Sequence, residues 1–143
     1  MAPEHVLVPL DGSPLADDAL AHALETFDCP VTVLNVVTPL DATMSEGGVL
    51  EADEERLEAA RTHAEEAIRR ARRQVSPKER TIETVVETGE PAETILAFVD
   101  AEDIDHVVLG GHGGPRMGAV RRLLGTVATT VVGEAPVSVT VVR

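Results

Sequence analysis

The sequence predicts a single α/β domain over residues 1–143, with five parallel strands and helices on both faces of the sheet. Short runs rich in Val alternate with segments whose apolar residues recur at helical spacing. This order is typical of a parallel sheet with crossover helices. The length of 143 residues and the apolar fraction of 43% suit one domain with a substantial core. No internal repeat or linker interrupts the pattern.

The first strand and helix are separated by a clear helix start. The run HVLVPL, His5–Leu10, is short, apolar and rich in Val, as expected of a buried strand. Ser13 and Pro14 follow it. A hydroxyl side chain caps the free N–H groups of a helix, and proline suits the first helical position. A helix is therefore expected to begin here and to continue to about Phe27.

The second strand and helix are longer. The run VTVLNVV, Val31–Val37, predicts another buried strand. Pro39, Gly47 and Gly48 favour a loop after it. A long helix is expected over about Leu50–Val75, because small and branched apolar residues recur on one stripe of that segment.

The second half of the chain repeats the alternation with shorter elements. Gly89 and Pro91 predict a turn into a short helix between the third and fourth strands. The third strand alternates in polarity, which favours a place near a sheet edge. The remaining elements are expected at Thr81–Glu87 (strand), Asp105–Gly110 (strand), Thr126–Val132 (helix) and Val137–Val142 (strand).

The charge and composition exclude several classes of partner. The formal net charge is −13, Lys78 is the only lysine, and Trp and Tyr are absent. Such a chain lacks the basic groove and the aromatic stacking residues of proteins that bind single-stranded nucleic acid. Its negative net charge also opposes binding to anionic membranes. The acidic, lysine-poor composition favours adaptation to high salt, where carboxylate repulsion is screened. An ordinary acidic cytosolic protein is the alternative.

The single cysteine and the N-terminal segment bear on location. Cys29 cannot form an internal disulfide and is interpreted as a small buried side chain. The N-terminal segment lacks the basic region of a signal peptide, and no apolar run is long enough to span a membrane. A cytoplasmic protein is expected.

A glycine-rich segment after the fourth strand marks a candidate ligand site. The sequence VVLGGHGGPRMGAVRRLLGT, Val107–Thr126, contains six glycines. Asp11 follows the first strand. In open α/β sheets, ligands bind beyond the carboxyl ends of the strands where the winding reverses. If the winding reverses between the first and fourth strands, the Asp11 carboxylate could bind a ribose hydroxyl or a base edge. Gly110 and Gly113 would let phosphates approach the backbone, and Gly125 would begin a helix whose N-terminus binds anions. Simple turn and capping roles remain the alternative.

The motifs VPLDGSPLADDAL, VLNVV, TGEPAETIL, VVLGGHG, LLGTVATTVV and APVSVTVV resemble, in this order, those of the universal stress protein (UspA-like) family. The resemblance covers nearly the whole chain. It implies a Rossmann-like fold, also described as adenine nucleotide alpha hydrolase-like, with strand order 3-2-1-4-5. It also implies a homodimer through the last strand, Val137–Val142, with Val139 and Val141 near the two-fold axis. One branch of the family binds ATP through the pattern G-x2-G-x9-G-[ST]; another lacks the pattern and does not bind.

The resemblance assigns roles to particular residues. Asp11 after Pro9 looks like the acidic residue that meets the adenosine, and Val36 resembles the hydrophobic residue beside the base. The strand end and glycine pattern resemble the phosphate-binding part of the site, which comprises Leu109, Gly110, Gly113, Gly125, Thr126 and Val127. Eleven residues separate Gly113 from Gly125 where the pattern has nine. An alternative pairing of Gly111 with Gly114 leaves ten.

The expected function is an ATP-dependent stress-response switch or sensor that uses ATP, alone or with Mg²⁺. No metal-ligand spacing, catalytic triad or Walker lysine is present, so at most slow ATP hydrolysis is expected. His112, Arg121 and Arg122 could contact phosphates, or they are solvated loop residues. A non-binding dimeric stress protein that acts by protein interaction is the first alternative. An adenylyl-transferring enzyme that uses His112 and Arg121 is the second.

Overall fold

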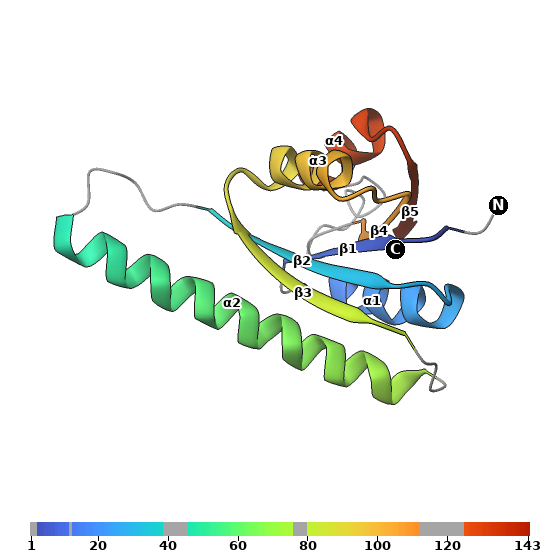
Figure 1. Ribbon diagram of the computed structural model, residues 1–143, viewed down its shortest axis with the longest axis horizontal. Helices are drawn as coiled ribbons and strands as arrows, with labels where there is room; N and C mark the ends of the chain where they lie inside the picture. The colour runs from blue at the N-terminus through green and yellow to red at the C-terminus, as the bar shows by residue number, and fades with distance from the viewer. Residues whose placement is uncertain (1–2, 12, 39–45, 76–79, 112–124) are drawn as a thin grey trace, which may run out of the picture.

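A computed structural model shows one five-stranded parallel sheet between two helical layers (Figure 1). It describes residues 3–11, 13–38, 46–75, 80–111 and 125–143, with side chains of the long second helix from residue 54 onward. The strand order is β3-β2-β1-β4-β5, which confirms the predicted order. The strands are β1 (Val6–Leu10), β2 (Val31–Val37), β3 (Ile82–Thr88), β4 (His106–Gly110) and β5 (Ser138–Val142). The helices are α1 (Pro14–Thr26), α2 (Glu46–Gln74), α3 (Pro91–Ala101) and α4 (Thr126–Glu134).

The central strand β1 divides the core into two halves. Val6, Val8 and Leu10 pack with α1 and α2 on one face of the sheet. Leu7 points to the other face and packs with α3 and α4. Successive side chains of a strand point to opposite faces, and helices cover both faces here. This arrangement explains why the run is continuously apolar instead of alternating.

Two helix starts carry side-chain caps. The Ser13 hydroxyl accepts a hydrogen bond from the Ala16 backbone N–H at 3.2 Å, as the sequence predicts. The Glu90 carboxylate caps α3 by accepting from the backbone N–H groups of Ala92 and Glu93, at 3.3 and 2.7 Å. The second cap was not predicted, because Glu is an uncommon capping residue.

The long helix begins earlier than predicted. It starts at Glu46 instead of Leu50, so the expectation that Gly47 and Gly48 lie in a loop was wrong. Each glycine costs a helix roughly 1 kcal/mol relative to alanine. In a helix of 29 residues this local cost does not end the element. The same tolerance explains why α4 continues through Gly133 to Glu134, two residues beyond the predicted end.

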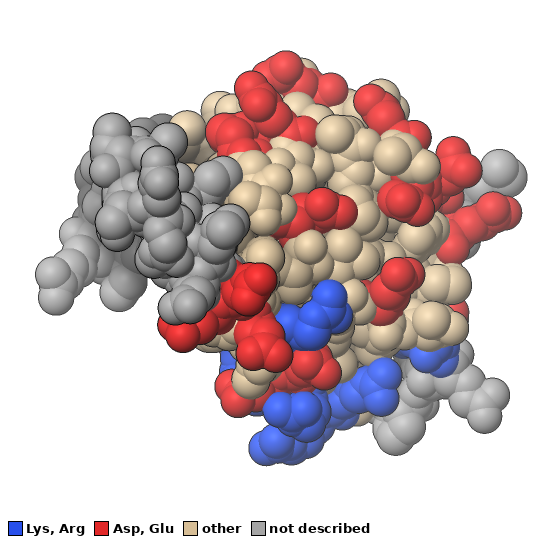
Figure 2. Space-filling view, turned by 60° about the vertical axis from the view of Figure 1, so that its left-hand side comes forward, with Lys and Arg blue, Asp and Glu red and all other residues tan. Residues whose placement is uncertain are grey.

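The surface carries many acidic side chains, and basic side chains gather near the last half of α2. On the face shown in Figure 2, Asp and Glu are spread over the upper and right-hand parts and also lie at the lower left, whereas Arg side chains gather along the lower edge, at the level where α2 runs in Figure 1. The last half of α2 contains Arg69, Arg70, Arg72 and Arg73. Arg70 bonds the Asp17 carboxylate of α1 at 2.9 Å and ties the two helices together. No helix within the described ranges is long and apolar enough to cross a membrane.

Candidate functional site

A proline opens the sheet where the winding reverses. In β1, the Val6 N–H donates to the carbonyl of Pro30, which directly precedes β2, so the backbone groups of Val6 face the β2 side. Because backbone groups alternate sides along a strand, the nitrogen of Pro9 faces β4, where it has no hydrogen to donate. The pairing of β1 with β2 continues to Leu10, but its pairing with β4 ends at Leu7. The two central strands are therefore free to part at their carboxyl ends.

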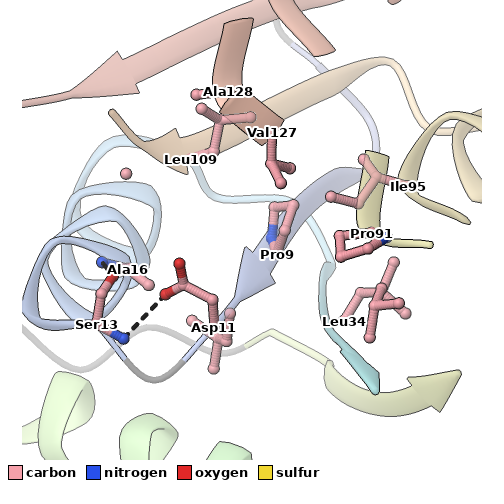
Figure 3. Close-up of a pocket in the computed structure, with 13 residues that line it drawn as sticks. Pro9, Asp11, Ser13, Ala16, Leu34, Pro91, Ile95, Leu109, Val127 and Ala128 are labelled. Carbon is pink, nitrogen blue, oxygen red and sulfur yellow. Dashed lines mark hydrogen bonds between the residues drawn. The ribbon is translucent and has the colours of Figure 1, made fainter. Parts of the chain in front are cut away.

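A pocket lies at this opening (Figure 3). Its volume is about 140 Å³, and its lining is mainly apolar. This is smaller than the roughly 300–1,000 Å³ of sites that enclose a whole drug-sized ligand. The pocket suits a flat apolar group with the rest of the ligand outside. Its lining residues are Pro9, Leu10, Asp11, Ser13, Ala16, Leu34, Val36, Pro91, Ile95, Leu109, Gly110, Val127 and Ala128.

The pocket brings together most of the site residues predicted from the sequence. Six of the nine line it directly: Pro9, Asp11, Val36, Leu109, Gly110 and Val127. Gly125 and Thr126 lie beside it at the start of α4. Gly113 lies outside the described residues, as do His112, Arg121 and Arg122.

Asp11 presents a carboxylate at the rim of the pocket. One oxygen accepts a hydrogen bond from the Ser13 backbone N–H at 2.9 Å, which turns the side chain toward the start of α1 (Figure 3). Asp11 is solvent-exposed. A carboxylate can accept several hydrogen bonds, so it retains capacity for a hydroxyl of a ligand.

Gly110 is required by packing against α1. An added Cβ would lie 2.7 Å from the Leu15 carbonyl carbon and 2.9 Å from the Ala16 nitrogen. Both atoms belong to the backbone and cannot rotate away. The missing side chain at Gly110 therefore makes room for the first turn of α1, a role different from the phosphate approach expected of it.

The start of α4 places backbone N–H groups at the pocket. Gly125 is the N-cap of this helix and supplies no side chain to cap it. The Gly125 N–H donates to the Gly111 carbonyl at 2.7 Å. The first N–H groups of a helix have no partner within it and favour anions. Val127 and Ala128 place this turn at the wall of the pocket.

Sequence reasoning missed the part of the pocket formed by α3. Pro91 and Ile95 line it opposite Leu34 of β2. These residues are ordinary helix and core residues in sequence, and no local pattern links them to Asp11. Only the return of α3 across the sheet brings them to the site.

Among the described residues, the two groups with clearly shifted pKa values lie at the other end of the sheet. Burial lowers the pKa of His106, the first residue of β4. Burial also raises the pKa of the half-buried Cys29 thiol, which precedes β2. Within the described ranges, no three His, Cys, Asp or Glu side chains gather as a metal site.

The family relationship agrees with this geometry. Residues 3–143 match the model of the Universal stress protein family, and the chain belongs to this family. It is 30% identical to universal stress protein MJ0531 of Methanocaldococcus jannaschii over 142 residues, which are 96% of this chain and 81% of the relative.

Solved structures show the same fold. Universal stress protein UspA from Lactobacillus plantarum is 27% identical with a TM-score of 0.77, over 100% of this chain and 99% of its own. The universal stress protein from Archaeoglobus fulgidus, in complex with dAMP, is 23% identical with a TM-score of 0.58, over 100% of each chain.

Proposed function

We propose that this universal stress protein binds an adenine nucleotide, ATP with Mg²⁺, at the opening between β1 and β4, and acts in the cytoplasm as a stress-response switch. The observation that carries the proposal is the apolar pocket that lies between a carboxylate, Asp11, and the start of α4. These three features match the base, the ribose and the phosphates of a nucleotide. The nucleotide in the Archaeoglobus fulgidus complex is dAMP, which supports this ligand class.

The pocket fits an adenine base in both shape and polarity. Leu34, Ile95 and Leu109 provide apolar surface for the faces of a ring. The Gly89 N–H donates to the Val37 carbonyl on the β3 side, so the backbone groups of Val36 face the β1 side. Strand β1 ends at Leu10, opposite Asn35. The Val36 carbonyl is thus directed beyond the end of β1, where it would accept from the amino group of adenine. Guanine would present a carbonyl oxygen there instead.

The phosphates would lie at the start of α4. Gly125 admits a phosphate close to the backbone, and the N–H groups of Thr126 and Val127 would donate to it. Gly113 is assigned to the same role by its place in the motif. Asp11 is the only carboxylate among the described residues that line the pocket. Mg²⁺ would therefore be held mainly by phosphate oxygens, as is common for this ion.

The site favours binding over fast chemistry. The only lysine of the chain is Lys78, which comes in sequence before the amino end of β3, whereas the pocket lies at the carboxyl ends of the strands. Phosphoryl transfer depends on cations that stabilise the transferred group. At most slow hydrolysis is therefore proposed, so that the bound nucleotide would serve as a signal.

We also propose that β5 pairs with β5 of a second copy in a homodimer. The Gly111 N–H donates to the Val142 carbonyl at 2.8 Å, which places the backbone groups of Val142 and Thr140 on the β4 side. The groups of Val139 and Val141 then face outward from the sheet edge. An exposed edge without Lys or Pro is a template for another strand, and an antiparallel pair about a two-fold axis would satisfy both copies.

Calorimetry with ATP and related nucleotides tests the binding proposal. ATP is expected to bind, and Asp11→Asn should weaken binding by about tenfold, because a hydrogen bond to a charged acceptor is worth roughly 1.5–3 kcal/mol. The amide side chain introduced by this substitution retains an oxygen for the Ser13 N–H. Asp18→Asn, at an exposed position of α1 outside the pocket, is the matched control. An absence of heat with ATP, ADP and AMP at millimolar concentration would place the protein among the non-binding members of the family.

A further inference from the structure

A second cavity continues from the nucleotide pocket onto the opposite face of the sheet. It lies between the end of β2 and helix α2, and it shares Asp11 and Val36 with the first pocket. Its volume is about 440 Å³, larger than that of the apolar pocket. The further residues that line it are Asn35, Val37, Thr38, Arg56, Ala59, Ala60 and His63. The two cavities thus meet at the position proposed for the ribose.

The wall formed by α2 is basic in a protein of net charge −13. Arg56 and His63 are seven residues apart, which places them on one side of the helix two turns apart. Arg70 is the next residue in this row, and it bonds Asp17 of α1 at 2.9 Å. This bond shows that the side of α2 that carries Arg56, His63 and Arg70 faces α1. Arg56 and His63 line the same cavity as Asp11, which directly follows β1. Arg56 is half-buried, whereas His63 is exposed.

Small and polar residues shape the space between the two basic side chains. The short side chains of Ala59 and Ala60 leave space above the helix between Arg56 and His63. The Asn35 amide donates to the Ala60 carbonyl at 3.5 Å and links the end of β2 to this part of α2. Thr38 lines the same cavity and carries a hydroxyl group. Arginine, imidazole and hydroxyl groups together form a donor set suited to a phosphate.

We propose that this cavity binds a second phosphate carried on the 2′ or 3′ oxygen of the ribose, so that the protein prefers adenosine bisphosphates over AMP. The inference rests on the proposed nucleotide function. With the base in the apolar pocket and the 5′ phosphate at the start of α4, the ribose would lie near Asp11, which lines both cavities, and its 2′ and 3′ oxygens would be within reach of the cavity at α2. The Asp11 carboxylate also lines this cavity, so the attraction of Arg56 and His63 would have to outweigh its repulsion of the phosphate.

Calorimetry with AMP, adenosine 2′,5′-bisphosphate and adenosine 3′,5′-bisphosphate tests the inference. One of the bisphosphates is expected to bind about tenfold more tightly than AMP, as one charge-assisted contact provides. The preferred isomer identifies the oxygen that carries the second phosphate. Without a specific site, the extra charge would instead weaken binding to so acidic a protein.

Two variants of the same helix assign the effect to Arg56. Arg56→Gln should remove the preference and leave the AMP affinity unchanged. Arg69→Gln, at an exposed position of α2 outside both cavities, should retain the preference. Circular dichroism tests whether both variants are folded. If Arg56→Gln is not folded, His63→Gln replaces it, and this variant should reduce the preference.

The outcomes separate this inference from the proposed function. If AMP binds and neither bisphosphate binds more tightly, the second site is refuted while the nucleotide function stands. The same conclusion follows if the preference survives in Arg56→Gln as fully as in Arg69→Gln. If none of the three compounds binds, the second site is refuted, and the calorimetry with ATP described above decides whether the nucleotide function also fails. A bisphosphate that binds where AMP does not supports both.

Discussion

Replacing Gly110 with alanine tests whether this glycine is required for packing. The added Cβ would stand 2.7 Å from the Leu15 carbonyl carbon and 2.9 Å from both the Leu15 oxygen and the Ala16 nitrogen. These distances are well below ordinary van der Waals contact, and all three atoms belong to the backbone of α1. Relief of the overlap requires α1 to move away from β4. Ala16 is buried and α1 packs across the core, so this movement disturbs many contacts.

The expected cost follows from overpacking of a close-packed core. Such substitutions cost roughly 1–3 kcal/mol. Restricting the unfolded chain by replacing glycine returns about 0.4–1 kcal/mol. A net loss of roughly 1–2 kcal/mol corresponds to a fall in the melting temperature of about 2–8 °C for a domain of this size.

Thermal unfolding followed by circular dichroism, at one fixed salt concentration, measures this loss. Gly133→Ala is the matched control, because an added Cβ there meets nothing within 4 Å and the residue lies inside α4. Alanine is favoured over glycine in a helix by roughly 1 kcal/mol, so this variant should melt at a higher temperature than the wild type. A Gly110→Ala variant that melts at or above the wild-type temperature would refute the packing role of Gly110.

Three further predictions concern assembly, salt and pH. Val139→Pro should convert the proposed dimer to a monomer in light scattering, because it removes an outward-facing backbone N–H donor. Thr140→Pro should instead destabilise the fold, since the backbone groups of Thr140 face β4. A Val139→Pro variant that stays dimeric excludes this interface. The melting temperature should rise from low to molar salt as carboxylate repulsion is screened, and an unchanged value would contradict adaptation to salt. Burial lowers the pKa of His106, whose ring contacts Phe27 at 4.8 Å between centroids, so the unfolded chain takes up this proton first. The stability that depends on neutral His106 should be intact above pH 6.5, the ordinary value, and decline as the pH falls below it. His106→Gln should show a smaller decline, and an identical pH profile would exclude this cause.

Local patterns were sufficient to predict the strands and their parallel arrangement, whereas the strand order was predicted from the family resemblance. Each strand is a run of Val-rich sequence, and the observed bounds of β2 are the predicted ones, Val31–Val37. The cap at Ser13 was also predicted, because capping depends on neighbouring residues only. The start of α2 was predicted wrongly because glycine propensity is a local penalty, whereas the helix extends over 29 residues.

The candidate site could be predicted only in part. Asp11 and the glycines were found because they follow strands in a recognisable order. Ile95 was not found, since its place in the pocket depends on how α3 packs over the sheet. The packing role of Gly110 was also hidden, because it depends on a contact with α1 almost a hundred residues earlier in the chain. Sequence order identifies which strand ends carry unusual residues, but only tertiary packing decides what faces them.

The backbone of a single residue, Gly111, links the proposed phosphate site to the edge strand. Gly111 accepts a hydrogen bond from the Gly125 N–H at 2.7 Å through its carbonyl, and its own N–H donates to the Val142 carbonyl at 2.8 Å. Gly125 begins the helix proposed to bind phosphate, and Val142 ends the strand proposed to pair with a second copy. If a phosphate drew the start of α4 toward itself, it would act directly on this connection. The short segment between α4 and β5 provides a second connection between the same two elements. The proposed nucleotide site and the proposed dimer edge are therefore joined through these backbone hydrogen bonds and this short segment. A nucleotide-dependent switch would require such a connection between its ligand site and its dimer interface.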